Sequence, residues 1–230
     1  MGKINIAIDG FSSCGKSTIA KALAADFNYV FVDTGAMYRA VSLFALNKGL
    51  FVGTQLNSEE LISQLDTIEI EFEFNAERGQ SDVILNGENV ESQIRNMEVS
   101  SRVSAVASIK EVRKKMVAQQ QKMGEKGGVV MDGRDIGTVV FPKASLKLFI
   151  TADTDIRTTR RYNELIAKGE QVTFQEVKEN LEQRDKMDTE REEDPLKQAE
   201  DAVLIDNSNL SPQEQLAMIK ALAKLRMPLS

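Results

Sequence analysis

The stretch Gly10-Phe11-Ser12-Ser13-Cys14-Gly15-Lys16-Ser17 fits the pattern G-x-x-x-x-G-K-S/T of a phosphate-binding loop. It follows a short apolar run, residues 4–9, that predicts a buried strand, and it precedes residues 18–25, which predict a helix. Strand, glycine loop and helix in this order are the context that the motif requires. The backbone N–H groups of such a loop surround phosphate oxygens, and the start of the helix adds partial positive charge.

Four residues of this loop have assignable roles. Lys16 is expected to reach the β- and γ-phosphates of a nucleotide, and the Ser17 hydroxyl is expected to ligate Mg2+. Gly10 and Gly15 supply backbone angles that a Cβ atom would penalise. The loop therefore predicts a site for a nucleoside triphosphate with its metal ion.

The amino-acid composition limits which binding partners and which catalytic groups this protein can have. The 230 residues suffice for one large domain or for a core with insertions. A net charge of −6 argues against nonspecific binding of nucleic acid, but it leaves room for a local basic cleft that holds a small anion. Since the chain has no histidine, catalysis has to depend on carboxylates, Arg, Lys, hydroxyls and bound metal. Its one cysteine, Cys14, excludes an intrachain disulfide and favours a reducing compartment.

Nothing in the sequence indicates export or membrane insertion. The chain enters a strand directly, so we expect no signal peptide, and no apolar stretch approaches the length of about 18 residues that a transmembrane helix needs. We therefore expect a cytoplasmic protein without a membrane or nucleic-acid partner. No segment reads as an extended apolar face, so we also expect a monomer.

The two ends of the chain predict an α/β core of the P-loop type, a parallel sheet with helices on both faces. A second buried strand, 29–33, precedes a helix over 36–47, and further apolar strands are expected at 128–132, 146–150 and 202–206. A last helix is expected to begin at Ser211-Pro212, with Ser as its N-cap and Pro in its first position.

The middle of the chain reads as an inserted region of a different kind. Residues 68–74 alternate apolar and acidic side chains, which is typical of a half-exposed antiparallel strand. Residues 82–85 are the expected partner strand, and Asn86-Gly87 predicts a tight turn. Residues 95–123 predict a helix that is broken near Ser108.

Two charged helices, 154–168 and 173–191, follow the insertion and are joined by a turn at Gly169. Such a helical pair could form a mobile lid. We therefore divide the chain into a core that contains the phosphate-binding loop (1–55, 127–153 and 195–230), an inserted region (56–126) and lid helices (154–194).

Arginines cluster at the positions where such a fold binds anions. Arg39 and Arg134 follow predicted core strands, and ligands of open α/β sheets bind at the carboxyl ends of the strands. An arginine there can bind phosphate with two parallel hydrogen bonds. In the first lid helix, Arg157, Arg160 and Arg161 share one face, where three like charges repel each other, so their clustering suggests an anionic ligand.

Carboxylates complete the candidate site. Asp33, Asp132 and Asp135 lie near predicted strand ends, where one of them could position Mg2+ or orient the acceptor. Spacing alone does not decide between them. We expect a structural role for Asp9, which directly precedes the loop.

Taken together, these motifs resemble the bacterial-type cytidylate kinases, among the nucleoside monophosphate kinases, over nearly the whole chain. The resemblance rests on Ile8-Asp9-Gly10 with Gly15-Lys16-Ser17-Thr18, on residues 33–39 (DTGAMYR), on residues 132–142 (DGRDIGTVVFP) and on Arg184-Asp185-x-x-Asp188-x-x-Arg191. The first motif occurs in many ATPases, whereas the second and third are much more specific.

The resemblance implies transfer of the γ-phosphoryl group of ATP to CMP or dCMP, which gives CDP or dCDP. It also implies that the core is ATP-binding and that the inserted region, 56–126, is monophosphate-binding. It implies ATP binding by Gly10, Phe11, Ser12, Ser13, Cys14, Gly15, Lys16, Ser17 and Thr18, with Ser17 also on Mg2+. It places CMP against Asp33, Thr34, Arg39, Ser104, Arg113, Arg134, Asp135, Arg184, Asp188 and Arg191, with Ser104 and Arg113 on the cytosine. The expected catalytic residues are Lys16, Arg134, Asp135, Arg157, Arg160 and Arg184.

Two alternatives stay open at this point. Another P-loop kinase could act on UMP, AMP, shikimate or dephospho-coenzyme A, although the insertion with Ser104 and Arg113 favours a nucleotide acceptor. A nucleotide-dependent switch protein is the second alternative, but the Asn-Lys-x-Asp motif that reads guanine in GTPases is absent from the sequence.

Overall fold

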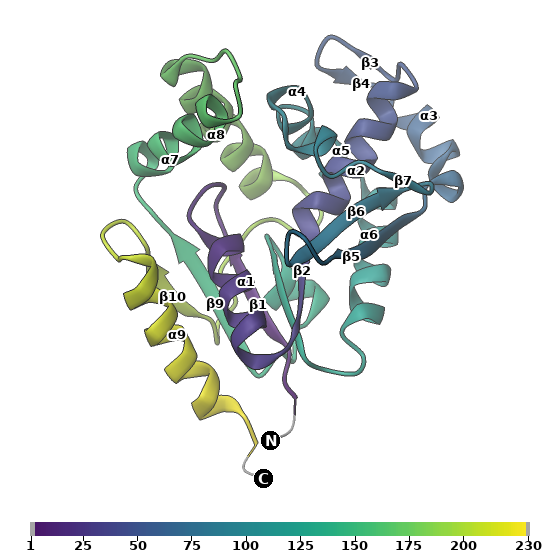
Figure 1. The fold of residues 1–230 in the computed structure, drawn as a ribbon. Coiled ribbons are helices and arrows are strands. Elements are labelled where there is room, and N and C mark those ends of the chain that lie inside the picture. Colours follow the sequence, from purple (N-terminus) through teal and green to yellow (C-terminus); the bar gives the residue numbers. More distant parts are fainter. Residues whose placement is uncertain (1–2, 229–230) are drawn as a thin grey trace.

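The computed structural model describes residues 3–228 and has a five-stranded parallel sheet at its centre (Figure 1). The strand order is β10-β9-β1-β8-β2, and every neighbouring pair is parallel. This confirms the predicted fold class. The strands are β1 (Ile6–Gly10), β2 (Val30–Asp33), β8 (Val129–Gly133), β9 (Leu146–Thr151) and β10 (Val203–Asp206).

Both faces of this sheet are covered, because alternate side chains of its strands enter two different apolar layers. On one face, Ile6 and Ile8 pack with α1 (Lys16–Phe27) and α9 (Pro212–Arg226). On the other face, Ala7 packs with the short π-helical turn η3 (Ile136–Val140). The predicted start of α9 is confirmed, since Ser211 is its N-cap, Pro212 is its first residue, and Ser211 and Glu214 form a reciprocal capping box.

The insertion contains the predicted antiparallel sheet. Its strands are β5 (Ile70–Asn75), β6 (Gln80–Leu85) and β7 (Glu88–Asn89), preceded by a small hairpin of β3 (Phe51–Val52) and β4 (Gln55–Leu56), by α3 (Ser58–Ser63) and by η1 (Leu65–Thr67). Asn86 and Gly87 both have positive φ, 51° and 83°, as a two-residue hairpin turn of this kind requires. The expected tight turn is therefore confirmed.

The helical part of the insertion is more broken than predicted. It consists of η2 (Gln93–Arg95), α4 (Met97–Ser100), α5 (Val103–Ala107) and α6 (Lys110–Met123). The predicted break near Ser108 is present, but a second break at Ser101-Arg102 was not foreseen. At that break the hydroxyls of Ser100 and Ser101 donate to backbone carbonyls one turn earlier, at Asn96 and Glu98. Such bonds compete with regular helix.

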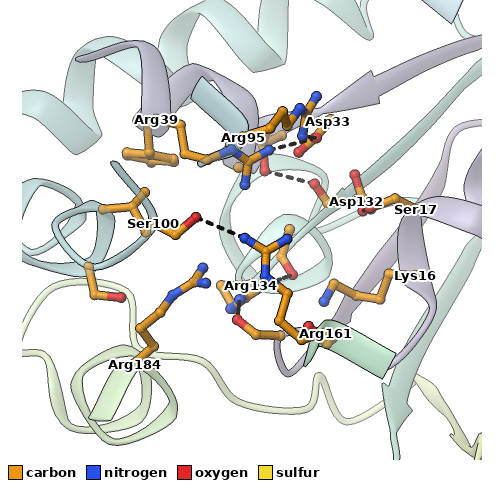
Figure 2. A pocket seen from close by; sticks show the side chains of 18 of the residues that line it. Lys16, Ser17, Asp33, Arg39, Arg95, Ser100, Asp132, Arg134, Arg161 and Arg184 are labelled. Atoms are coloured by element: carbon orange, nitrogen blue, oxygen red, sulfur yellow. Dashed lines mark hydrogen bonds and ion pairs between the residues drawn. The ribbon is translucent and has the colours of Figure 1, made fainter. Parts of the chain in front are cut away.

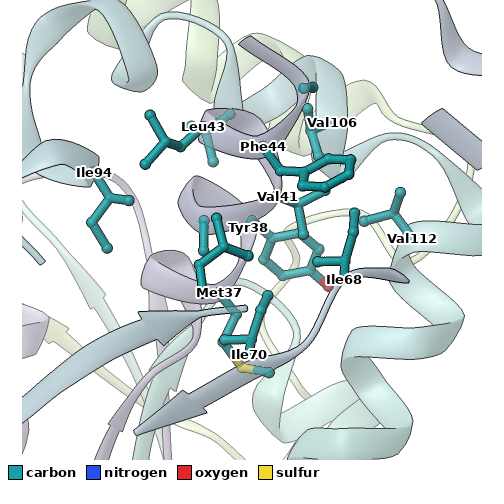
Figure 3. Close-up of a cluster of buried hydrophobic side chains, with 14 of the residues drawn as sticks. Met37, Tyr38, Val41, Leu43, Phe44, Ile68, Ile70, Ile94, Val106 and Val112 are labelled. Atoms are coloured by element: carbon teal, nitrogen blue, oxygen red, sulfur yellow. The ribbon is translucent and has the colours of Figure 1, made fainter. Parts of the chain in front are cut away.

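Helix α2 (Thr34–Asn47) joins the insertion to the sheet. Its buried residues, among them Met37, Val41 and Phe44, pack against Ile70 of β5 and Val112 of α6 in one apolar cluster (Figure 3). Because α2 begins directly after β2, this cluster fixes the insertion near the carboxyl ends of the central strands. The division of the chain into core, insertion and lid stays a prediction.

The two charged helices α7 (Thr154–Ala167) and α8 (Phe174–Glu190) form the expected helical pair. Leu165, Val177 and Leu181 hold them together in a small apolar cluster. Figure 1 shows this pair and the insertion at the same end of the molecule, on either side of the central sheet's carboxyl edge. Among the helices of residues 3–228, none combines the length and the apolar character needed to cross a membrane.

Candidate active site

A cavity of about 980 Å³ opens at the carboxyl ends of the central strands, between the phosphate-binding loop, the insertion and the lid helices. Twelve Lys and Arg side chains line it, against seven Asp and Glu side chains. This local excess of positive charge contrasts with the net charge of −6 of the whole chain. The sequence analysis allowed for a local basic cleft that holds a small anion, and the folded chain contains one (Figure 2).

The two glycines of the phosphate-binding loop are required by its shape. Gly10 has a φ of 142°, and a Cβ atom there would lie 1.9 Å from the carbonyl oxygen of Ile150. Gly15 has a φ of 97°, and a Cβ atom there would lie 2.5 Å from the side-chain nitrogen of Asn207. Helix α1 then begins without a side-chain cap, so its first N–H groups are available to an anion.

Lys16 is buried at the bottom of this loop. Its ammonium donates to the carbonyl oxygen of Phe11 at 2.5 Å and lies 3.7 Å from the Cys14 sulfur. Burial lowers the pKa of Lys16 from its ordinary value. Since Lys16 lines the cavity from within the loop, a bound phosphate can replace the Phe11 carbonyl as its partner.

Not every expected loop residue lines the cavity. Gly10, Phe11 and Cys14 do not, whereas Ser12, Ser13, Gly15, Lys16, Ser17 and Thr18 do. Phe11 packs edge-on against Phe149, and the Cys14 carbonyl accepts a 2.7 Å hydrogen bond from Asn207. These contacts hold the shape of the loop.

Ser17 and Asp132 meet at the end of β8. The Ser17 hydroxyl donates to Asp132 Oδ2 at 2.6 Å, while Asp132 Oδ1 is buried and, within residues 3–228, has no hydrogen-bond partner. Burial, together with the neighbouring Asp33 carboxylate, raises the pKa of Asp132 to about 6. A hydroxyl beside an unsatisfied carboxylate oxygen is the kind of oxygen pair that Mg2+ binds.

Asp9 has the structural role expected for it. Its two carboxylate oxygens accept backbone hydrogen bonds of 2.7 Å from Ile136 and Gly137, which anchors η3 to the end of β1. Burial raises the pKa of Asp9 to about 7, against the opposing effect of these two hydrogen bonds.

Asp33, Arg39 and Arg95 form a second charged group at the start of α2. Asp33 caps this helix through the backbone N–H of Ala36, and its Oδ2 accepts hydrogen bonds from Arg39 at 2.8 Å and Arg95 at 2.6 Å. Burial acts to raise the pKa of Asp33, but the two guanidinium groups hold it below its usual range. Thr34 also lies here, and its hydroxyl donates to the Asp132 carbonyl at 2.8 Å.

The far side of the cavity contains a buried network of polar side chains. Asp188 of α8 accepts hydrogen bonds from Ser104 of α5 at 2.9 Å and from Arg134 at 2.8 Å. Arg134 also donates to the hydroxyl of Ser12 at 2.6 Å, so one arginine connects the phosphate-binding loop with the lid.

Arg113 is the largest fully buried side chain of the described residues and lies beside this network. It forms ion pairs with Asp135 and Asp194, and its guanidinium carbon is 5.7 Å from the ring centre of Tyr38. Arg191 lies 3.9 Å from the Asp135 carboxylate. The Tyr38 hydroxyl is buried and has no hydrogen-bond partner in the described part of the chain.

The three arginines of α7 contact different partners, although they lie on the same helix. Arg157 does not line the cavity; it pairs with Asp185 of α8 at 2.5 Å and donates to the Ser12 carbonyl. Arg160 donates to the Asn207 carbonyl at 2.8 Å, and Arg161 donates across the cavity to Ser100 of the insertion at 3.1 Å (Figure 2).

Three arginines that line the cavity each have a buried guanidinium nitrogen without a hydrogen-bond partner among residues 3–228. Of the described residues, Arg39 Nε, Arg160 Nη1 and Arg184 Nε are buried and make no hydrogen bond. Burial, with the charge of Arg134 as the next cause, lowers the pKa of Arg184 to about 9. Since a buried unpaired donor is costly, these three atoms indicate that an anionic ligand completes the site.

The structure thus brings together most of the predicted site residues and adds others. Among the cavity-lining residues that the sequence-based site did not include are Lys21, Tyr38, Arg78, Glu91, Arg95 and Ser100. Tyr38 lies within the motif at 33–39, so the motif could have indicated it. Arg95 and Glu91 lie in a segment without any motif, and only tertiary packing places them at the cavity.

A phosphate-binding loop at the edge of a parallel sheet, with an insertion and a helical lid around one basic cavity, defines a P-loop nucleotide-binding protein of the kinase type. The chain belongs to the cytidylate kinase family, whose model matches residues 6–225. The cytidylate kinase of Bacteroides fragilis is 53% identical over 221 residues, which cover 96% of each chain.

A second relative supports the same membership. The cytidylate kinase of Bacteroides thetaiotaomicron is 54% identical over 215 residues, which cover 94% of each chain. Among solved structures, an uncharacterized protein from Eubacterium ventriosum has a similar fold, with a TM-score of 0.50 at 13% identity over 97% of this chain and 99% of that one. The expected resemblance to the cytidylate kinases is confirmed.

Proposed function

We propose that this protein phosphorylates CMP and dCMP, with ATP as the phosphoryl donor and CDP or dCDP as the product. The observation that carries the proposal is one cavity that connects the phosphate-binding loop with the buried Ser104, Arg113 and Asp135 and has unpartnered arginine nitrogens along its wall. The family membership of the whole chain agrees with this reaction.

The donor triphosphate lies in the loop before α1. The free N–H groups at the start of α1 and the Lys16 ammonium neutralise the β- and γ-phosphates. Arg160 and Arg184 approach from the lid helices, and their unpartnered nitrogens supply the charge that stabilises the transferred phosphoryl group. Phosphoryl transfer needs little more than this positioning and electrostatic stabilisation.

The acceptor lies between the insertion and the lid. Arg39 and Arg134 bind its phosphate, while Arg113 and Ser104 face the base and Asp188 faces the sugar. A cytosine edge offers an amino donor and two acceptors, which match a guanidinium, a hydroxyl and a carboxylate. An adenine would leave some of these buried groups unpaired, and that mismatch lowers its affinity.

A Mg2+ ion fits the pair formed by Ser17 and Asp132. The hydroxyl lies at the start of α1, beside the expected phosphates, and Asp132 Oδ1 is a buried oxygen without a hydrogen-bond partner in residues 3–228. Ser17 would hold the ion directly and Asp132 through water, and the ion would neutralise charge on the phosphates. The protein's own part is to keep these two oxygens 2.6 Å apart at the wall of the cavity.

A coupled assay of ATP conversion to ADP, with CMP, dCMP, UMP, AMP and shikimate as separate acceptors, tests the proposal. We expect the highest kcat/KM with CMP or dCMP. Equal or faster turnover of AMP would contradict the cytidylate assignment, and turnover of a non-nucleotide acceptor alone would favour another class of P-loop kinase.

A further inference from the structure

A chain of alternating charges runs from the hairpin of the insertion to the acceptor site. It begins at Asp82 on β6 and ends at Arg39 on α2. Its members, in order, are Asp82, Arg78, Glu91, Arg95, Asp33 and Arg39, and the ion pairs between neighbours span 2.5 to 3.6 Å. Five of the six residues line the cavity, all except Asp82.

We propose that Arg95, beside Arg39, is a further ligand of the acceptor's phosphate. Glu91 is the residue that positions Arg95. This inference rests on the proposed function. Neither residue belongs to a motif of the sequence. The cavity-lining position of Arg95 and its shared contact with Arg39 carry the proposal (Figure 2).

Arg39 and Arg95 converge on one atom. Both donate to Oδ2 of Asp33, from distances of 2.8 and 2.6 Å, so their guanidinium groups lie within reach of a single anion. Two like charges this close repel each other, and a phosphate dianion offsets that repulsion better than one carboxylate does. The buried Nε of Arg39 has no hydrogen-bond partner among the described residues, which points to the same missing anion.

Arg95 has donors to spare. Its Nε donates to Oε1 of Glu91 at 3.0 Å and its Nη1 donates to Asp33 at 2.6 Å. Since a guanidinium has five N–H donors, hydrogens on both Nη atoms stay available for phosphate oxygens. The Arg95 side chain is 28% exposed, so a ligand in the cavity can reach it.

Glu91 fixes the direction of Arg95. Its Oε1 lies 2.9 Å from Nη2 of Arg95 and 3.0 Å from Nε. Glu91 therefore occupies the edge of the guanidinium formed by Nε and Nη2, and the opposite edge points away from Glu91. The second oxygen of Glu91 is buried without a partner in the described part of the chain. Burial of a carboxylate with only one oxygen hydrogen-bonded costs stability, so packing alone does not explain why Glu91 lies here.

The insertion offers a matched control. Glu98 and Arg102 form another ion pair four residues apart in the same segment, but neither lines the cavity. The experiment compares Arg95→Met, Arg95→Lys and Glu91→Gln with Arg102→Met and Glu98→Gln. For each variant, kcat, the KM values of CMP and ATP, and the Kd values of CMP and cytidine are measured, with thermal unfolding as the folding control.

We expect Arg95→Met to raise the KM and Kd of CMP about ten- to a hundred-fold, with unchanged Kd for cytidine, which lacks the phosphate. Arg95→Lys should recover part of this loss, and Glu91→Gln should raise the KM of CMP by less than Arg95→Met. Equal weakening of CMP and cytidine, or no difference from the control variants, would overturn the inference. A wild-type enzyme that does not phosphorylate CMP would instead refute the proposed function.

Discussion

The hydroxyl of Ser17 and the carboxylate of Asp132 lie 2.6 Å apart, although Ser17 belongs to the first turn of α1 and Asp132 to the end of β8, more than a hundred residues further along the chain. Ser17 is fixed by the start of α1, and Asp132 by the parallel pairing of β8 with β1. Their meeting point is therefore set by the sheet and by the helix that follows its first strand.

Replacement of Asp132 by Asn should raise the Mg2+ concentration needed for half-maximal activity and lower kcat about 100-fold or more, because a neutral amide holds the hydrated ion less well than a carboxylate. In the wild type, the raised pKa of about 6 means that Asp132 takes up a proton as the pH falls through 6, so we expect Mg2+ affinity to fall there. A Mg2+ titration of the initial rate at several pH values measures both effects. Asp206→Asn, at the exposed end of β10, is the control, and an equal loss in both variants would count against the metal role.

Asp9 gives a prediction about stability and pH. Its pKa is raised from 3.8 to about 7, so between these pH values the folded protein keeps a proton that the unfolded chain has lost. Stability conferred by this group therefore decreases as the pH rises from about 4 to about 7, by at most about 1.4 kcal/mol per pH unit. Urea unfolding at several pH values should show this decline in the wild type and a flatter profile in Asp9→Asn. If the free energy of unfolding depended on pH equally in the wild type and in Asp9→Asn, the prediction would be refuted.

Lys16→Ala should lower kcat about 100- to 1,000-fold, because the buried ammonium is positioned to neutralise the transferred phosphoryl group. Lys48→Ala, at the exposed residue that follows the end of α2, should leave kcat unchanged. Steady-state kinetics at saturating CMP measure both. A kcat of Lys16→Ala within a few-fold of the wild type would remove Lys16 from the catalytic mechanism.

Arg113→Met tests the recognition of the base. It removes the buried partner of Asp135, so we expect kcat/KM for CMP to fall about ten- to a hundred-fold while the value for AMP changes little. The exposed neighbour Lys114, replaced by Met, is the control. Thermal unfolding is measured alongside, since breaking a buried ion pair destabilises a protein by about 3–5 kcal/mol. An unchanged ratio of CMP to AMP turnover would exclude Arg113 from base recognition.

The features that the sequence predicted correctly depend on local patterns. The phosphate-binding loop, the Asn86-Gly87 turn and the Ser211 cap each require particular residues at adjacent positions. The inner strands β1, β8 and β9 are buried on both faces, so they are continuous apolar runs that are visible without a structure. Residue roles in the site and the monomeric state stay predictions.

The features that the sequence analysis did not predict depend on which partners the charged ends of long side chains reach. Helical spacing placed Arg157, Arg160 and Arg161 on one face of α7, but spacing does not tell which partner each guanidinium reaches. In the structure they contact α8, the loop after β10 and the insertion, respectively. Arg95 was missed for a related reason, because its contact with Asp33 spans 62 positions of the chain.

The central claim is that one cavity holds both nucleotides with their phosphates facing each other. An inhibitor that joins cytidine and adenosine through a polyphosphate chain tests it most directly, in steady-state kinetics with ATP and CMP varied in turn. We predict inhibition that is competitive against ATP and against CMP, and weaker inhibition by the analogue with two adenosines. Competition against one substrate only, or equal inhibition by both analogues, would contradict the claim.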